Sequence, residues 1–327
     1  MGEAVVITRD LQKDFGSVKA LRGLDLEVRR GEIWGLIGPD GAGKTTALRL
    51  LAGLFPPTRG EALVLGARLT PLGAAALERA RHRIGYMPQG QCCYGDLTVS
   101  ENLHFFGRIY GVGSPARKER IDFLLEFTGL APFARRPADH LSGGMRQKLG
   151  LACSILPEPE LLLLDEPTTG VDPAARQDFW DLLRALRQER EPAVLIATPY
   201  MDEAARCDQI VLLHEGRVLA VGPPASLAGL LEGKILEVKV AQGAQIYRAR
   251  EVLASLPGVK DANLFGDHLH LTVEQIQEEE VQAALAGAGL PDAEVRQVPP
   301  SCEDIFLSLL ARRGNMVERG DGSDGPG

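Results

Sequence analysis

The chain has 327 residues and a formal net charge of −8 at pH 7, and 45% of its residues are hydrophobic. This composition is that of a packed globular protein, and the negative charge argues against binding to nucleic acid through overall charge, so no nucleic-acid partner is expected. The length predicts two domains, because single cores rarely grow beyond about 250–300 residues.

The five cysteines are few, odd in number and not spaced as CxxC pairs. They indicate a reducing cytosolic compartment, with neither a disulfide framework nor a zinc site. The first residues, MGEAVVITRDLQ, lack the basic and apolar regions of a secretory signal. No apolar run approaches the roughly 20 residues that span a bilayer. We therefore expect any membrane association to occur from one side and through a partner.

Strands and helices are predicted to alternate through the first 222 residues. Residues 3–37 contain short apolar or alternating runs separated by glycine-rich breaks, which predict β-structure. Residues 44–54 place leucines at helical spacing and end at a Pro-Pro pair, which predicts a helix. The elements expected next are helices within 97–157, a strand at 161–164, a helix at 173–190, a strand at 193–198, a short helix at 201–206 and a hairpin at 209–222. This alternation predicts an α/β fold with a parallel sheet.

The pattern changes after Gly222-Pro223-Pro224. Residues 234–313 read as βαββαβ with a final helix, which predicts a small α+β domain of the ferredoxin-like type. The last residues, GNMVERGDGSDGPG, are rich in glycine and aspartate and predict a disordered tail. The predicted domains are therefore residues 1–222 and 223–313, followed by a disordered tail at 314–327.

The stretch GPDGAGKTT, residues 38–46, fits the phosphate-binding pattern G-x-x-x-x-G-K-[ST] between a strand and a helix. A glycine-rich turn lets backbone N–H groups point at one anion, and the following helix adds its positive end. Lys44 is expected to reach the β- and γ-phosphates, and Thr45 to hold Mg²⁺. The nucleotide contacts predicted in this loop are Gly38, Asp40, Gly41, Ala42, Gly43, Lys44, Thr45 and Thr46.

Two further motifs add chemistry. In LLLLDEP, residues 161–167, a buried strand ends on two carboxylates. Asp165 is predicted to take the Mg²⁺ shell and Glu166 to act on an attacking water. In LSGGMRQ, residues 141–147, Ser142 is a good N-cap and Gly143 and Gly144 leave the backbone open, as in an anion-binding helix start. The alternative for this motif is an ordinary capped helix.

GPDGAGKTT, YMPQ, LSGGMRQ and LLLLDEPTTGVDP, in this order, resemble the nucleotide-binding subunit of ABC transporters over about residues 3–222. The resemblance implies a P-loop NTPase sheet with an antiparallel β subdomain and a helical signature subdomain. It implies ATP and Mg²⁺ as cofactors and two subunits, identical or different, paired head to tail. Each ATP would lie between one subunit's phosphate loop and Ser142, Gly143 and Gly144 of the other.

The same resemblance implies a transmembrane permease subunit that contacts residues 97–130. The chain would then be peripheral at the cytoplasmic face of the inner or plasma membrane, by association only. Gln89 matches a glutamine that contacts Mg²⁺ and the attacking water. Phe15 matches an aromatic that stacks on adenine, with core packing as the alternative. Asp172 matches the family's D-loop acid and is counted among the predicted nucleotide contacts, and helix N-capping is an alternative compatible with that role.

Two positions depart from the family pattern. Asp40 replaces the usual Asn or Ser of the loop, and we expect it to face outward because a carboxylate repels a triphosphate. Pro199 stands where the family places a switch histidine that contacts the γ-phosphate. The carboxyl-terminal PPSCEDIFLSLLARR resembles an accessory domain of drug- and antibiotic-exporting subunits, which favours export over import.

The leading prediction is an ATPase subunit that powers a membrane exporter by ATP-driven dimerisation. The alternative raised by Pro199 is a regulatory subunit that clamps nucleotide and hydrolyses it weakly. A third hypothesis is an ABC protein that acts on ribosomes or DNA. Such proteins usually carry two nucleotide domains or a long coiled coil, and this chain shows neither.

Overall fold

The computed structural model describes residues 3–70, 78, 80–90, 92–240 and 245–320, with side chains described as far as Arg313. The chain divides into two compact units, Met1–Pro223 and Pro224–Gly327. Each unit has its own sheet and its own hydrophobic core.

The first unit is built on a six-stranded sheet with the strand order β11-β10-β4-β9-β8-β7. Its strands are β4 (Ile33–Ile37), β7 (Ile84–Met87), β8 (Leu161–Asp165), β9 (Ala193–Thr198), β10 (Gln209–His214) and β11 (Arg217–Gly222). All neighbours pair in parallel except β10 and β11. Every residue of β4, β8 and β9 is buried, which explains their unbroken apolar sequences. The predicted parallel α/β sheet is therefore confirmed.

A five-stranded antiparallel sheet forms the predicted β subdomain. Its strands are β1 (Ala4–Phe15), β2 (Val18–Arg22), β3 (Leu26–Arg29), β5 (Arg59–Val64) and β6 (Ala67–Leu69). One hydrophobic core joins this sheet, α1 (Lys44–Leu51) and the six-stranded sheet. The shared core fixes the strand that precedes the phosphate loop and the helix that follows it.

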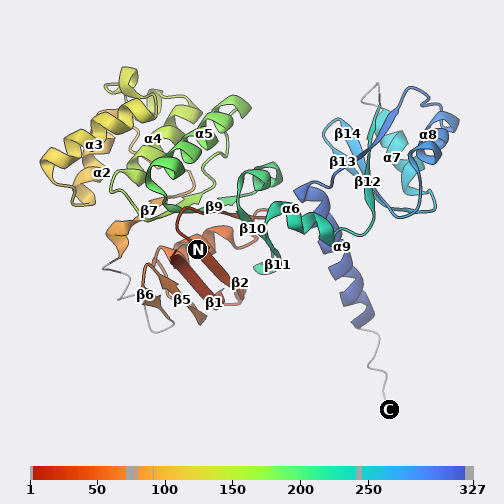
Figure 1. The fold of residues 1–327 in the computed structure, drawn as a ribbon, viewed down its shortest axis with the longest axis horizontal. Helices are drawn as coiled ribbons and strands as arrows, with labels where there is room; N and C mark the ends of the chain where they lie inside the picture. Colours follow the sequence, from red (N-terminus) through yellow and green to blue (C-terminus); the bar gives the residue numbers. More distant parts are fainter. Residues whose placement is uncertain (1–2, 71–77, 79, 91, 241–244, 321–327) are drawn as a thin grey trace, which may run out of the picture. The chain divides into compact units, whose positions relative to one another are not determined.

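The remaining helices of the first unit gather apart from β1, β2, β5 and β6, with β7 and β9 between the two groups (Figure 1). They are α2 (Val99–Ile109), α3 (Ser114–Phe127), α4 (Gly143–Ile155) and α5 (Pro173–Arg190). Thr98, Ser142 and Asp172 cap α2, α4 and α5 with their side chains. Short 3₁₀ turns are η2 (Arg81–Arg83), η3 (Ala131–Phe133), η4 (Ala138–His140) and η5 (Met201–Arg206).

The second unit holds a four-stranded antiparallel sheet with the order β13-β14-β12-β15. Its elements are α6 (Pro224–Leu227), η6 (Ala228–Leu230), β12 (Lys234–Lys239), α7 (Ile246–Ala254), β13 (Val259–Phe265), β14 (His268–Val273), α8 (Glu278–Gly287), β15 (Glu294–Val298) and α9 (Cys302–Gly320). The four strands, together with α7 and α8, follow the βαββαβ order that the sequence predicts. Apolar residues of β12 and β14 pack with α7 and α8 in one core.

The predicted start of a disordered tail at residue 314 is wrong, because α9 continues to Gly320. A helix that is already formed gains one hydrogen bond for each residue it adds, so the segment NMVER extends it with little opposition. Residues 321–327 of the predicted tail lie outside the described part of the chain.

Candidate functional site

The carboxyl ends of β4, β8 and β9 meet at one edge of the six-stranded sheet. Ile37 pairs with Thr198, and Asp165 pairs with Ala197. The backbone N–H of Gly38 donates to the carbonyl of Thr198 at 3.4 Å, and that of Glu166 donates to the carbonyl of Ala197 at 2.8 Å. The sheet thus brings together the glycine-rich loop, the two acids and the segment containing Pro199. Such an edge is where open α/β sheets bind ligands.

Two glycines of the loop have no room for a side chain. A Cβ on Gly38 would lie 2.1 Å from the carbonyl oxygen of Leu213. Gly43 has a φ of 102°, and its Cβ would lie 2.5 Å from the carbonyl oxygen of Ala20. Gly43 is also the residue that precedes α1, so the tight turn places the amino end of this helix at the loop. A helix start of this kind presents backbone N–H groups to an anion.

Lys44 is only 4% exposed, and its side chain lies along the loop. Its Nζ donates to the carbonyl oxygens of Gly38 at 2.8 Å and Pro39 at 3.0 Å. The same nitrogen lies 3.9 Å from Glu166 Oε1. Burial lowers the pKa of Lys44 from its ordinary value, and nearby carboxylates, first Glu166, oppose that shift.

Asp165 is fully buried and linked to the loop helix. Thr45 Oγ1 donates to Asp165 Oδ1 at 2.8 Å, and the Tyr86 hydroxyl lies 3.4 Å from Asp165 Oδ2. Burial raises the pKa of Asp165, although these hydrogen bonds and nearby cations act against the rise. The hydroxyl and the carboxylate form a compact pair of oxygen donors, which suits a hard cation such as Mg²⁺.

Glu166 combines burial with an unusual backbone conformation. It is 6% exposed, and its φ of 51° lies in the left-handed region. A non-glycine residue held there costs on the order of 1–3 kcal/mol, and such residues concentrate at functional sites. Thr169 Oγ1 donates to Glu166 Oε2 at 3.2 Å, so the carboxylate is held from one side by Thr169 and approached by Lys44 from the other.

A cavity of about 670 Å³ lies over the loop. Its lining residues are Ser17, Val18, Lys19, Ala20, Arg22, Asp40, Gly41, Ala42, Gly43, Lys44, Thr45, Thr46, Gln89, Glu166 and Glu215. The cavity thus brings Gln89 and Glu166 to the predicted loop residues, although Gln89 follows β7 and Glu166 follows β8. Asp40 is solvent-exposed but also lines this cavity, so the outward orientation expected for it stays a prediction.

Several lining residues carry no recognisable sequence signal. Val18, Lys19, Ala20 and Arg22 come from β2, and Glu215 comes from the turn between β10 and β11. They reach the cavity through packing, since the backbone N–H of Arg22 donates to the carbonyl of Gly216 at 2.7 Å.

Phe15 is not among the described residues that line this cavity. It ends β1, is 45% exposed, and meets the Phe55 ring edge-on with the ring centroids 5.6 Å apart. The Nζ of Lys13 lies 5.1 Å from the centre of the Phe15 ring. The exposed ring excludes the alternative of deep core packing, and adenine stacking stays a prediction.

The LSGGMRQ motif forms a second helix start. Ser142 Oγ accepts from the Met145 N–H at 3.3 Å, and Asp172 Oδ1 accepts from the Ala175 N–H at 2.9 Å, so both residues are N-caps. A Cβ on Gly144 would lie 2.5 Å from the Cβ of Ala175, so glycine allows α4 and α5 to start side by side. Among the described cavity-lining residues, Ser142, Gly143, Gly144 and Asp172 are absent. The chain therefore has two separate helix starts, one at the loop cavity and one at the LSGGMRQ motif.

The segment after β9 is tied to α5. The Tyr200 N–H donates to Thr198 Oγ1 at 3.1 Å, across the half-buried Pro199. The guanidinium of Arg176 lies 4.1 Å from the centre of the Tyr200 ring. Glu203, to which the sequence pattern assigned no role, is fully buried and accepts from Thr168 Oγ1 at 2.7 Å and Trp180 Nε1 at 3.1 Å.

A buried sheet edge carrying a glycine-rich loop, a lysine, a helix start and two acids defines a P-loop nucleotide-binding protein. Residues 21–169 match the ABC transporter family. The chain is 36% identical over 311 residues to Nod factor export ATP-binding protein I of Ralstonia nicotianae, covering 94% of each protein. This chain therefore belongs to the ABC transporter family.

Other relatives and solved structures agree with this membership. The chain is 39% identical over 319 residues, 96% of its length, to the probable multidrug ABC transporter ATP-binding protein YbhF of Escherichia coli. It spans about half of that relative, 53% of its length. The structure of an ATP-binding subunit of an ABC transporter matches at 30% identity with a TM-score of 0.61, covering 69% of this chain and 92% of that one.

A dimeric ATP-binding cassette in a post-hydrolysis state bound to ADP and Pi matches at 26% identity with a TM-score of 0.60. The match covers 67% of this chain and 98% of that cassette. In the part of the chain that the structure describes, no helix has both the length and the apolar character needed to cross a membrane.

Proposed function

We propose that this chain hydrolyses ATP as the energy-supplying subunit of a membrane exporter. The observation that carries the proposal is the meeting of Lys44 and Thr45 with Asp165 and Glu166 at one edge of the six-stranded sheet. Of these four residues, all except Asp165 line one cavity together with Gln89. The names of relatives given above, a multidrug transporter protein and a Nod factor export protein, support export.

The loop, the two acids and Gln89 each have a proposed role toward ATP. Backbone N–H groups of the loop and the Lys44 ammonium bind the phosphates, and Lys44 exchanges its contacts to Gly38 and Pro39 for phosphate oxygens. Thr45, Asp165 and Gln89 offer the oxygen atoms that would hold Mg²⁺. When bound, Mg²⁺ neutralises charge on the phosphates. Glu166 accepts a proton from the attacking water, and Gln89 helps to orient that water.

The second helix start serves a second nucleotide. Since Ser142, Gly143 and Gly144 are apart from the loop cavity, we propose that they contact ATP bound by another subunit, identical or different. Asp172 lies at the start of the neighbouring helix and belongs to the same interface. ATP would then join two subunits head to tail, and its hydrolysis would release them.

The permease partner is proposed to bind beside α2. Residues that follow Gln89 in the chain help to line a cavity of about 430 Å³. Its walls include the aromatic residues Tyr94, Phe106 and Tyr110 and the cysteines Cys92, Cys93 and Cys153. The Tyr94 side chain is 49% exposed there and contacts the Phe105 ring with the centroids 4.7 Å apart. A short apolar helix of a transmembrane subunit fits these aromatic walls. Its attachment would hold the chain peripherally at the cytoplasmic face of the membrane.

The decisive experiment compares Glu166→Gln with the wild-type chain, using Glu189→Gln on an exposed face of α5 as the matched control. Loss of the proposed base should lower MgATP turnover by at least about 100-fold. ATP should still bind, and sedimentation should show an ATP-dependent dimer of Glu166→Gln. Unchanged turnover in Glu166→Gln would remove Glu166 as the base, and a monomer at every ATP concentration would contradict the shared-nucleotide arrangement.

A further inference from the structure

The sheet of the second unit carries a polar group of side chains on one face. Glu237 on β12 pairs directly with His270 on β14, and His268 lies two residues before His270. Because side chains alternate across a strand, these three share one face. The alternating residues Leu236, Val238, Leu269 and Leu271 belong to the apolar core formed with α7 and α8.

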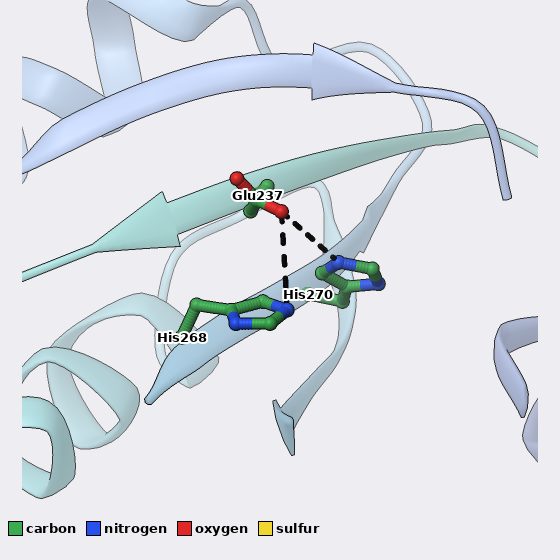
Figure 2. A group of neighbouring side chains, drawn as sticks. All are labelled: Glu237, His268 and His270. Carbon is green, nitrogen blue, oxygen red and sulfur yellow. Dashed lines mark ion pairs between the residues drawn. The ribbon is translucent and has the colours of Figure 1, made fainter. Parts of the chain in front are cut away.

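The three side chains direct donor atoms to one point. His268 Nε2 and His270 Nε2 each lie 3.8 Å from the same carboxylate oxygen, Glu237 Oε2. One ligand atom from each residue lies within 4.8 Å of the other two. Figure 2 shows Glu237 on β12 above and both imidazole rings on β14 below, with dashed lines from the Glu237 carboxylate to a nitrogen of each ring.

In all three side chains, the polar atom that does not face the cluster contacts another charged side chain. His270 Nδ1 lies 3.0 Å from both carboxylate oxygens of Asp304, and His268 Nδ1 lies 2.9 Å from Asp267 Oδ1. An Nδ1–H that donates to a carboxylate leaves the Nε2 lone pair of the neutral ring for a metal. Arg296 Nε donates to Glu237 Oε1 at 2.7 Å, which leaves Oε2 facing the two rings.

The cluster is enclosed on several sides. Glu237, His270 and Asp304 are 8%, 7% and 3% exposed, and the Phe265 ring stacks on His270 with the centroids 4.4 Å apart. Asp304 comes from α9 and is itself held by the Ser301 hydroxyl at 2.6 Å. Neighbours from β13, β15 and α9 therefore fix the orientation of the side chains, as they do around protein metal sites.

The competing interpretation is a set of ion pairs between protonated histidines and Glu237. A charge-assisted N–H···O bond is about 2.7–2.9 Å long, whereas both Nε2 atoms stop at 3.8 Å. Two ligands on a tetrahedral zinc ion lie roughly 3.4 Å apart, given bonds of about 2.1 Å. The observed spacing is too long for hydrogen bonds and needs only small side-chain movements to accept an ion.

We propose that Glu237, His268 and His270 bind a divalent transition metal, with zinc as the ion that two imidazoles and a carboxylate suit. Asp304 and Asp267 act as positioning residues for the two rings. With three protein ligands the ion keeps a position for water or for a group from a partner. The site uses no cysteine and lies outside residues 21–169, which match the family.

The test uses the full chain with its purification tag removed, stripped of metal with a chelator and kept free of nucleotide. Calorimetric titration with Zn²⁺ should show one ion per chain. Loss of a group that supports a metal ligand typically weakens metal binding by roughly 10–100-fold. His268→Asn and Glu237→Gln remove proposed ligands themselves, so each should weaken Zn²⁺ binding by at least that much. Asp304→Asn should fall in that 10–100-fold range. His82→Asn, at an exposed residue outside the cluster, should bind like wild type.

Two further measurements separate loss of the site from loss of the fold. Zn²⁺ should raise the Tm of the wild-type chain and of His82→Asn but not that of His268→Asn. Co²⁺ should give the visible spectrum of a nitrogen- and oxygen-ligated ion. A sulfur-to-cobalt charge-transfer band would show that a cysteine binds the ion and would overturn the proposal. Equal Zn²⁺ affinity in wild type, His268→Asn and Glu237→Gln would overturn it as well.

Discussion

Thr45 Oγ1 donates a hydrogen bond to Asp165 Oδ1 at 2.8 Å, across a separation of 120 residues. The contact joins the first turn of α1 to the end of β8 and depends on the packing of both against the same sheet. The two oxygen atoms are those to which we assign Mg²⁺. The bond brings these two oxygen atoms to within 2.8 Å of each other.

Thr45→Ala should raise the Mg²⁺ concentration needed for half-maximal ATP turnover by at least about tenfold, because one proposed oxygen ligand is lost. The measurement is ATP turnover against Mg²⁺ at fixed ATP. Thr45→Ser keeps the hydroxyl and should stay close to wild type. An equal Mg²⁺ requirement in the alanine and serine variants would show that the Thr45 hydroxyl does not hold the ion.

Asp165→Asn should raise the Tm of the nucleotide-free chain by a few degrees at neutral pH. Burial raises the pKa of Asp165 above its ordinary value of 3.8, so the folded chain binds this proton more tightly than the unfolded chain. The ionised carboxylate then destabilises the fold at every pH above that raised pKa. The asparagine carries no charge and can still accept from Thr45.

The sign of this effect predicts its pH dependence. The Tm difference between Asp165→Asn and wild type should be largest at neutral pH and shrink as pH falls through the raised pKa toward the ordinary value. Thermal unfolding at a series of pH values measures it. Asp178→Asn, which removes an exposed carboxylate paired with Lys148, is the control and should show no such gain. A lower Tm for Asp165→Asn at neutral pH would contradict the burial argument.

Pro199→His should raise ATP turnover roughly tenfold, equivalent to about 1.4 kcal/mol of barrier. The half-buried proline follows β9 beside the end of β8 and offers no side-chain donor or acceptor, whereas an imidazole can contact both phosphate and water. Pro199→Ala controls for the loss of the proline ring alone. Should all three chains hydrolyse ATP equally fast, Glu166 and Gln89 hold the water without help from this position.

Glu203→Ala should destabilise the first unit by about 3–5 kcal/mol, because it leaves the donors of Thr168 and Trp180 without their buried acceptor. It also removes the buried carboxylate whose Oε1 lies 3.9 Å from Arg176 Nε. Denaturant unfolding followed by tryptophan fluorescence is a suitable measurement, since both tryptophans, Trp34 and Trp180, belong to this unit. Asp202→Ala removes the exposed neighbour that also pairs with Arg176 and should cost at most about 1 kcal/mol. An equal loss of unfolding free energy in the two variants would contradict the claim that the buried carboxylate contributes more than the exposed one.

The amino-acid sequence predicted the elements whose signals are local. The apolar runs of β4, β8 and β9, the spacing of Gly38, Gly43 and Lys44, and the capping residues Ser142 and Asp172 each act through neighbours a few positions away. The structural role of these residues can therefore be predicted from the sequence alone. The local composition gave a wrong prediction at residue 314. The glycine-rich segment predicted disorder from that residue on, whereas α9 continues to Gly320.

Only the tertiary structure decided which distant residues meet. Strand pairing places Ala197 beside Asp165 and thus Pro199 at the proposed catalytic edge. The alternation His268-Leu269-His270 is local and places two imidazoles on one face of a strand, although no site was predicted from it. Glu237 joins them only because β12 pairs with β14 in that register. A shift of one residue would turn Glu237 to the opposite face, so the cluster depends on a pairing that no short stretch of sequence encodes.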